Sequence, residues 1–208
     1  MMRRQLAIKV VAAFAALLTL TACSSSANQA GSSTTSVGSP ATSNSPPGPQ
    51  PHNDADTMFA KQMIPHHQQA IQMSDIIIGK QGIDPRVIQL ANQIKAAQGP
   101  EIQTMQAWLS QWGQSTTPGM PGHSGMPGMP GMSGTMSEQD MQALQNAQGV
   151  EASKLFLTQM IQHHQSAITM AQDEIKSGRY PPATALAHSI VTNQQQEINT
   201  MQSILASL

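Results

Sequence analysis

The 208-residue chain has one cysteine, few aromatic residues and few charged ones. Because Cys23 has no second cysteine to pair with, no internal disulfide can form, and the fold must depend on a hydrophobic core. Only 10% of the residues are charged and the net charge is −1, so the sequence offers no basic surface for nucleic acid. Binding of nucleic acid is therefore not expected.

Motifs of common enzyme classes are also missing. The sequence contains no Glu-x-x-His, the pair that di-iron enzymes of the ferritin type place on two of their helices. It contains no phosphate-binding loop and no Ser-His-Asp pattern. We therefore expect a protein that is not an enzyme, and a ferritin-like di-iron oxidase is the weaker alternative.

The N-terminal residues are typical of an export signal. A basic start with Arg3 and Arg4 precedes an apolar run over residues 10–20, which is too short to span a membrane. Cys23 directly follows Leu-Thr-Ala, an arrangement that resembles a lipobox. The sequence predicts a lipoprotein signal peptide at residues 1–22, lipidation of Cys23, and a location at the outer face of the cytoplasmic membrane or in the cell envelope. The alternative is an ordinary signal peptide with an incidental cysteine.

Two low-complexity segments delimit the predicted folded domain, residues 54–208. Residues 23–53 are rich in Ser, Thr, Pro and Gly and lack bulky side chains, which predicts a disordered tether. Residues 114–136 combine Gly and Pro with methionine, and this composition disfavours both helix and strand. The segment separates a predicted first hairpin at residues 54–113 from a second at residues 137–208.

Four long segments have apolar residues at helical spacing, and none alternates with the period of a strand. Pro65 should kink the first helix just before His66, or break it there. The expected fold is all-α. The long helices are placed at about residues 56–78, 84–113, 151–176 and 181–208, and a short one at 137–147.

An internal repeat relates these helices. The pattern Phe-x3-Met-Ile-x-His-His-Gln-x-Ala-Ile-x-Met starts at Phe59 and again at Phe156, an offset of 97. The pattern Ala-x2-Ile-x3-Gln-x2-Glu-Ile-x2-Met starts at Ala91 and again at Ala187, an offset of 96. Two duplicated helical hairpins pack most simply as an antiparallel four-helix bundle with a pseudo-two-fold axis.

These twin motifs resemble the bacterial family called domain of unknown function 305, and the resemblance covers essentially all of residues 54–208. It implies a ferritin-like bundle. Some members of that family are implicated in periplasmic copper binding and resistance, so the resemblance also implies copper as a ligand.

The histidines and methionines of the repeat share one helix face, because residues three, four and seven apart on a helix lie on the same side. Imidazole together with thioether suits copper, and thioether favours Cu(I) over Cu(II). The alternative is that these side chains only fill and hydrogen-bond a core. The predicted ligands are His66, His67, His163, His164, Met63, Met73, Met160 and Met170.

The partner helices place polar residues on their core-facing stripes. A buried carboxylate is costly unless it is paired, and it can orient a ligating imidazole through the second ring nitrogen. The spacing leaves open which histidine of each pair binds the metal. The residues predicted to support the ligands are Glu101, Glu197, Gln98 and Gln194.

Methionines in the segment at residues 114–136 are not needed for packing, so we predict that they capture Cu(I). The alternative is a plain linker. Thioethers do not titrate, whereas imidazoles with an ordinary pKa of ~6.5 become protonated in mild acid, so only the loop is expected to hold metal there. The candidate loop ligands are Met120, His123, Met126, Met129, Met132 and Met136.

Together these features predict an exported copper-binding lipoprotein that sequesters, buffers or passes on copper. Its partners would be the metal ion and, through Cys23, the membrane. The alternative function is that of a helical scaffold or interaction module of the cell envelope.

Overall fold

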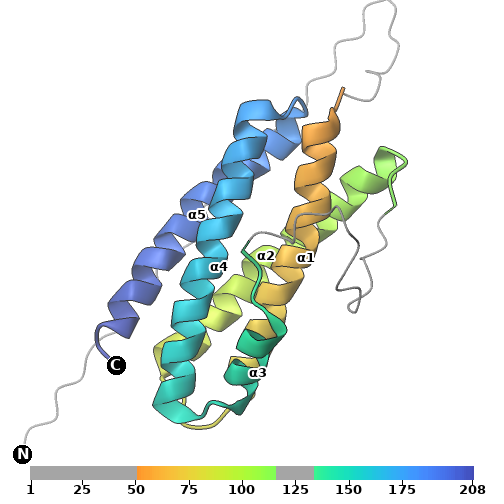
Figure 1. Ribbon diagram of the computed structural model, residues 1–208. Coiled ribbons are helices and arrows are strands. Elements are labelled where there is room, and N and C mark those ends of the chain that lie inside the picture. Colours follow the sequence, from red (N-terminus) through yellow and green to blue (C-terminus); the bar gives the residue numbers. More distant parts are fainter. Residues whose placement is uncertain (1–50, 116–133) are drawn as a thin grey trace, which may run out of the picture. The chain divides into compact units, whose positions relative to one another are not determined.

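The computed structural model describes residues 51–115 and 134–208, and the regular structure in these two ranges is entirely helical (Figure 1). The predicted all-α bundle of two helical hairpins is confirmed. No helix within these ranges is both long enough and apolar enough to cross a membrane. The helices are α1 (Asp54–Ile78), α2 (Pro85–Gln111), α3 (Glu138–Asn146), α4 (Gly149–Ser177) and α5 (Pro181–Leu205).

Several sequence predictions fall on residues that the structure does not describe. They include the signal peptide, the lipidation site and most of the tether. Most of the candidate loop ligands belong to this group too. The residues concerned are Cys23, Met120, His123, Met126, Met129 and Met132.

Helix α1 begins two residues earlier than the sequence pattern indicated, because of its N-terminal cap. The Asn53 side chain accepts a hydrogen bond from the Asp56 amide (3.1 Å), and the Asp56 carboxylate accepts one from the Asn53 amide (2.7 Å). This reciprocal capping box satisfies two amides that would otherwise lack partners at the start of the helix. Pro65 does not break α1, which continues to Ile78.

The two hairpins pack along α1 and α4. Helix α1 packs against α2 and α4 against α5, while the short α3 covers α1 and α4. Helices α1 and α4 are antiparallel, because Asn53 at the start of α1 donates to the Ser177 carbonyl at the end of α4 (2.8 Å). At the other end, the Asp84 amide donates to the Ser153 hydroxyl near the start of α4 (3.4 Å).

Two hydrophobic clusters fill the bundle, one toward each end. The first combines the C-terminal half of α1 with the N-terminal half of α4 and includes Met73 and Phe156. The second combines the other halves of the same helices and includes Phe59 and Met63. Two buried alanines, Ala70 and Ala167, lie one in each cluster at equivalent positions of the repeat.

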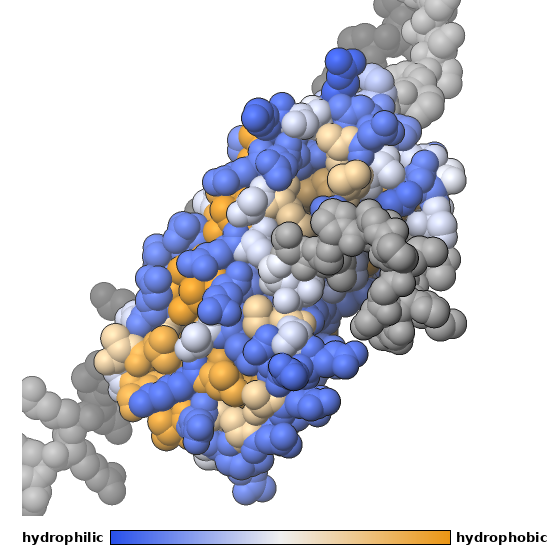
Figure 2. Space-filling model, in the orientation of Figure 1, coloured by the Kyte–Doolittle hydropathy of each residue, from blue (hydrophilic) through white to orange (hydrophobic). Residues whose placement is uncertain are grey.

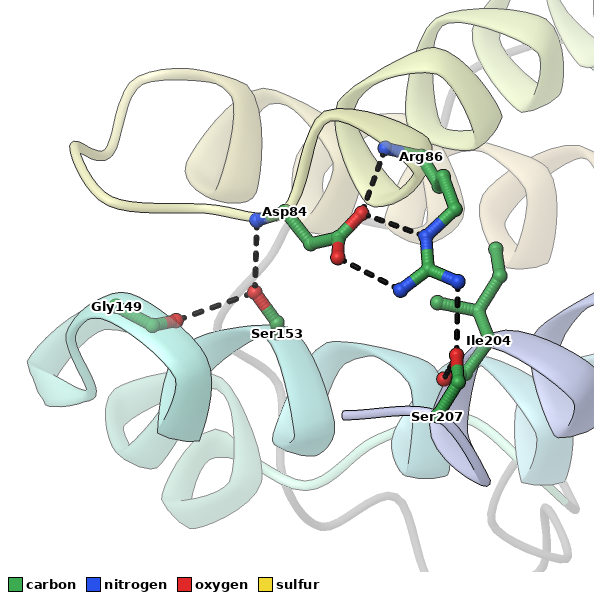
Figure 3. A network of polar contacts seen from close by, with 6 residues as sticks. All are labelled: Asp84, Arg86, Gly149, Ser153, Ile204 and Ser207. Atoms are coloured by element: carbon green, nitrogen blue, oxygen red, sulfur yellow. Dashed lines mark hydrogen bonds and ion pairs between the residues drawn. The ribbon is translucent and has the colours of Figure 1, made fainter.

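A network of polar contacts around Asp84 and Arg86 joins the start of α2 to α4 and to the residues after α5 at one end of the bundle (Figure 3). The guanidinium group of Arg86 donates two hydrogen bonds to Asp84 (2.9 and 2.8 Å) and a third to the Ser207 hydroxyl (2.7 Å). Ser153 links Asp84 in turn to the Gly149 carbonyl (3.1 Å). The start of α2 is thereby fastened to α4 and to the C-terminal residues after α5.

Most of the visible surface is hydrophilic (Figure 2). On the face shown there, hydrophobic residues gather in an interrupted band along α4 and α5. Met58 and Val150 are the exposed large hydrophobic residues within the described ranges. The apolar surface of the helices is therefore mostly directed into the bundle.

A buried pair of carboxyl groups lies at the opposite end from Arg86. Asp56 accepts hydrogen bonds from the amides of Arg179 (3.1 Å) and Tyr180 (2.9 Å), in addition to that of Asn53. These bonds lower the pKa of Asp56 although its burial opposes the shift. Glu174 lies beside Asp56 in the same buried site. Its burial first, and the neighbouring Asp56 second, raise the pKa of Glu174 to about 8. Near neutral pH the pair therefore holds one proton.

Candidate metal centre

Two histidines from the two halves of the repeat meet at the centre of the bundle. His66 on α1 and His163 on α4 occupy equivalent positions, and their ring centroids are 3.6 Å apart with the planes tilted by 35°. Both side chains are buried, with 1% and 0% of their surface exposed. Because equivalent residues face each other, the pseudo-two-fold axis passes between these rings.

The hydroxyl of Ser166 determines which nitrogen of His66 is free. Ser166 Oγ lies 2.7 Å from His66 Nε2, 2.7 Å from the carbonyl oxygen of His163 and 3.2 Å from that of Gly134. Carbonyl oxygens can only accept, so the single hydroxyl proton is shared between these two carbonyls, of which that of His163 is closer, and the hydroxyl oxygen accepts from the Nε2–H of His66. The neutral imidazole of His66 then carries its lone pair on Nδ1.

The neighbouring histidines are held in the same way by carboxylates of the partner helices. His67 Nε2 lies 2.7 Å from Glu101 Oε2, and His164 Nε2 lies 2.6 Å from Glu197 Oε2. Because a carboxylate accepts, each imidazole donates from Nε2, and the lone pair of the neutral ring is on Nδ1. A carboxylate in this position orients a ligating imidazole and increases its basicity.

All four imidazoles thus have an uncommitted Nδ1 in the interior. None of these nitrogens has a hydrogen-bond partner among residues 51–115 and 134–208, and His163 Nε2 also lacks one there. Buried ring nitrogens without partners are costly, so their recurrence at four positions requires an explanation. The nitrogens concerned belong to His66, His67, His163 and His164.

Burial keeps the two central imidazoles uncharged. It is the main cause that lowers the pKa of His66 to about 3, and the nearby His67 and His164 add to the shift. Burial likewise holds the pKa of His163 well below its ordinary value, with a further contribution from His66. The ordinary pKa assumed in the sequence-based expectation is therefore wrong for this central pair, and a neutral imidazole keeps its lone pair available in mild acid.

Thioether groups lie on both sides of the histidine layer. Met73 and Met160 belong to one core cluster, while Met63 belongs to the other and Met170 packs against it. Met170 is partly buried and the other three are completely buried. Since Met63 and Met160 each precede a central histidine by three residues, they lie one helical turn from it.

The supporting amides are buried as predicted for core-facing positions, but their roles are less defined. Both polar atoms of the Gln98 amide and the Oε1 atom of Gln194 lack hydrogen-bond partners in the described part of the chain. In the same part, no three His, Cys, Asp or Glu side chains come together as a ready-made metal site. A central ion would therefore need two imidazoles together with thioethers, which is a donor set for a soft ion.

Sequence patterns did not reveal Ser166 or Gln69. Ser166 contacts His66, and Gln69 binds the backbone of Met136 at the end of the methionine-rich segment. The repeat contained an available signal, because the two residues occupy equivalent positions three residues after His66 and His163. Because one residue has an amide and the other a hydroxyl, the repeat pattern did not mark the two as a pair.

The geometry can be compared with that of known proteins. Residues 56–205 match the family model described as domain of unknown function (DUF305). The chain belongs to the DUF305 family. A DUF305 fragment from Deinococcus radiodurans is 29% identical, has a TM-score of 0.65, and is matched over 76% of this chain and 99% of that one. A DUF305 protein of Streptomyces coelicolor, named as a candidate secreted protein, is 31% identical with a TM-score of 0.64, over 74% and 91% of the two chains.

A third solved structure, that of CopM, carries a metal. CopM in its Cu(II)-bound form is 31% identical to this chain, has a TM-score of 0.62, and is matched over 73% of this chain and 96% of CopM. CopM structures also exist in Cu(I)-bound, Ag-bound and apo forms. An uncharacterized protein of Acanthamoeba polyphaga mimivirus, L153, is 44% identical over 52 residues, which make up 25% of this chain and 34% of that protein.

Proposed function

We propose that this DUF305 protein binds copper, chiefly as Cu(I), in the centre of its helical bundle, and that it sequesters, buffers or passes on the ion without catalysing a reaction. The observation that carries this proposal is the set of four buried imidazoles whose Nδ1 atoms have no hydrogen-bond partner in the described chain. The similarity to CopM, which has been solved with Cu(I) and Cu(II), supports the same ion.

The residues present fit a soft metal ion. His66 and His163 provide facing neutral imidazoles, and Met63 and Met160 provide thioethers one turn away. Glu101 orients His67 at the edge of this layer, as Glu197 orients His164. When bound, copper would accept lone pairs from ring nitrogens that are otherwise buried without partners.

The alternative of a metal-free scaffold has no comparable support. A scaffold gains nothing from two uncharged imidazoles in contact in its core, because apolar side chains of similar size would pack there without unpartnered nitrogens.

We further propose that the protein acts outside the cytoplasm, anchored through a lipid on Cys23, and that the methionine-rich segment adds ligands for Cu(I). The support is the export-signal pattern before Cys23 and the similarity to the Streptomyces coelicolor protein. The Gly-Pro composition of residues 114–136 favours neither helix nor strand, so most of its methionines are not expected to be needed for packing. Met136 is an exception to this prediction, because it packs against the first core cluster.

A chelator-competition titration tests the proposal. In the soluble chain at residues 24–208, which lacks the predicted signal peptide and lipidation site, we expect the simultaneous change of the four repeat histidines to Ala to abolish tight Cu(I) binding under anaerobic conditions. The matched control is His52→Ala with His188→Ala, because both of these histidines are exposed. A quadruple variant that competes as well as the wild type would refute a histidine-based site. The four histidines are His66, His67, His163 and His164.

A further inference from the structure

Gly134, Thr135 and Met136 form a strap that is fastened to both central helices. The Gln69 amide on α1 makes two hydrogen bonds with the backbone of Met136, one to its carbonyl (2.9 Å) and one from its N–H (2.7 Å). On α4, the Ser166 hydroxyl donates to the Gly134 carbonyl (3.2 Å). Figure 1 shows this segment leading along α1 into α3.

The strap lies across the level of the central histidines. Gln69 and Ser166 each follow a central histidine by three residues, but α1 and α4 run in opposite directions. Gln69 therefore lies one helical turn from the histidine layer toward one end of the bundle. Ser166 lies one turn from it toward the opposite end. A segment that joins the two must cross the layer between them.

The contact at Ser166 is too close for any side chain on the strap. Gly134 has a φ of +95°, and a Cβ atom placed there would lie 1.9 Å from the Ser166 Cβ. Glycine is thus needed both for the backbone conformation and for the close approach. Through Ser166, the strap is two hydrogen bonds away from the Nε2 atom of His66.

We propose that the strap Gly134–Met136 is a gate that controls the exchange of the metal ion at His66 and His163; this inference rests on the proposed copper binding. The pair is almost fully buried, so an ion can reach the ring nitrogens only when some covering element opens. The hydrogen bonds that join the strap to the two central helices come from Gln69 and Ser166, which are themselves only partly buried, and the Met136 side chain packs against the first core cluster. An element of this kind opens at a lower cost than the helices beneath it.

Opening of the strap also has a chemical consequence at the site. When the Gly134 carbonyl leaves Ser166, the hydroxyl still has the His163 carbonyl as an acceptor (2.7 Å). The hydrogen bond from His66 Nε2 can therefore persist while the path to the imidazole pair opens. Gln69 and Ser166 act as positioning residues for the strap and need not contact the ion.

Gln69→Ala is the sharpest test, because Gln69 holds the strap without a hydrogen bond to any histidine. Loss of both hydrogen bonds should raise the population of the open strap on the order of tenfold. Gln72→Ala is the matched control, since Gln72 is exposed on the same helix one turn further along. Equal circular dichroism spectra and melting temperatures for the two variants establish that neither change disturbs the bundle.

The first readout needs no metal. Carbethoxylation of His66 and His163 by diethyl pyrocarbonate, followed by mass spectrometry on the soluble metal-free chain, should be about tenfold faster in Gln69→Ala than in wild type. The rate at the exposed His188 serves as the internal reference. Equal rates at the central pair in both variants would overturn the gate.

The second readout separates the gate from the proposed function. Transfer of Cu(I) from the loaded protein to excess chelator should accelerate by a similar factor in Gln69→Ala, with unchanged stoichiometry at equilibrium. If the wild type takes up no histidine-dependent Cu(I), the proposed function fails, while the carbethoxylation result still decides whether the strap covers the pair. If Cu(I) binds but leaves both proteins at the same rate, the gate fails and the metal site stands.

Discussion

Replacing His66 and His163 together with leucine should raise the melting temperature of the metal-free protein and abolish its tight binding of Cu(I). Three of the four ring nitrogens of this pair have no hydrogen-bond partner in the described ranges, and the exception is bound to Ser166. Each buried unpartnered group costs about 1–3 kcal/mol, and leucine fills a similar volume without one. After the loss of the Ser166 bond is deducted, a net gain of about 2 kcal/mol corresponds to roughly 5 °C.

The neighbouring histidine pair provides a control for which the opposite change in melting temperature is expected. Leucine at His67 and His164 should lower the melting temperature, because it leaves the carboxylates of Glu101 and Glu197 without the imidazole donors that they now have. Thermal unfolding of metal-free samples followed by circular dichroism measures both effects. A central leucine pair that destabilises the protein as much as the outer pair would mean that the histidines are structural. A gain in stability with loss of metal would be the pattern of a site retained for function.

The second large effect concerns Glu174, whose change to glutamine should remove a component of the pH dependence of stability. The folded pKa of about 8 lies above the ordinary value of 4.5, so between these pH values the folded state keeps a proton that the unfolded chain has released. Stability from this group is complete below pH 4.5 and is lost as the pH rises toward about 8, with a slope of at most about 1.4 kcal/mol per unit. Glutamine has nearly the same size and shape as glutamate and cannot ionise.

The measurement is the difference in unfolding free energy between wild type and Glu174→Gln, from urea titrations at pH 5 to 9. Taking the difference cancels the opposite trend from His66 and His163, whose lowered pKa values make stability rise with pH below 6.5. The unfolding free energy of the variant relative to the wild type should increase as the pH rises toward about 8. Asp173→Asn, an exposed position beside Glu174, is the matched control. A pH-independent difference would show that Glu174 is ionised in the fold.

The sequence pattern predicted the architecture well because the repeat carries it. The spacing of Phe59, Met63 and His66, repeated from Phe156, marks helices and indicates which face is buried. The roles of Glu101 and Glu197 followed from the cost of placing a carboxylate on a core-facing stripe, and each does pair with a histidine.

Other features depend on contacts between residues far apart in the chain. The sequence around Asp56 indicates only a residue that caps a helix. No nearby residue indicates that Glu174, 118 positions later, lies beside it. The strap is similar, because Gln69 and Ser166 are unremarkable polar residues until the end of the methionine-rich segment is placed between them. The pKa of His66 also depends on its degree of burial, which spacing alone does not give.

The most direct test of copper binding in the bundle is the location of the ion itself. A crystal structure of the Cu(I)-loaded soluble chain, with anomalous data collected at the copper edge, would show which atoms hold the metal. We expect an anomalous peak within bonding distance of Nδ1 of His66 and of a ring nitrogen of His163, with a thioether of Met63 or Met160 completing the site. Copper found only at exposed His52 or His188, with the rings of His66 and His163 still in direct contact, would contradict the account.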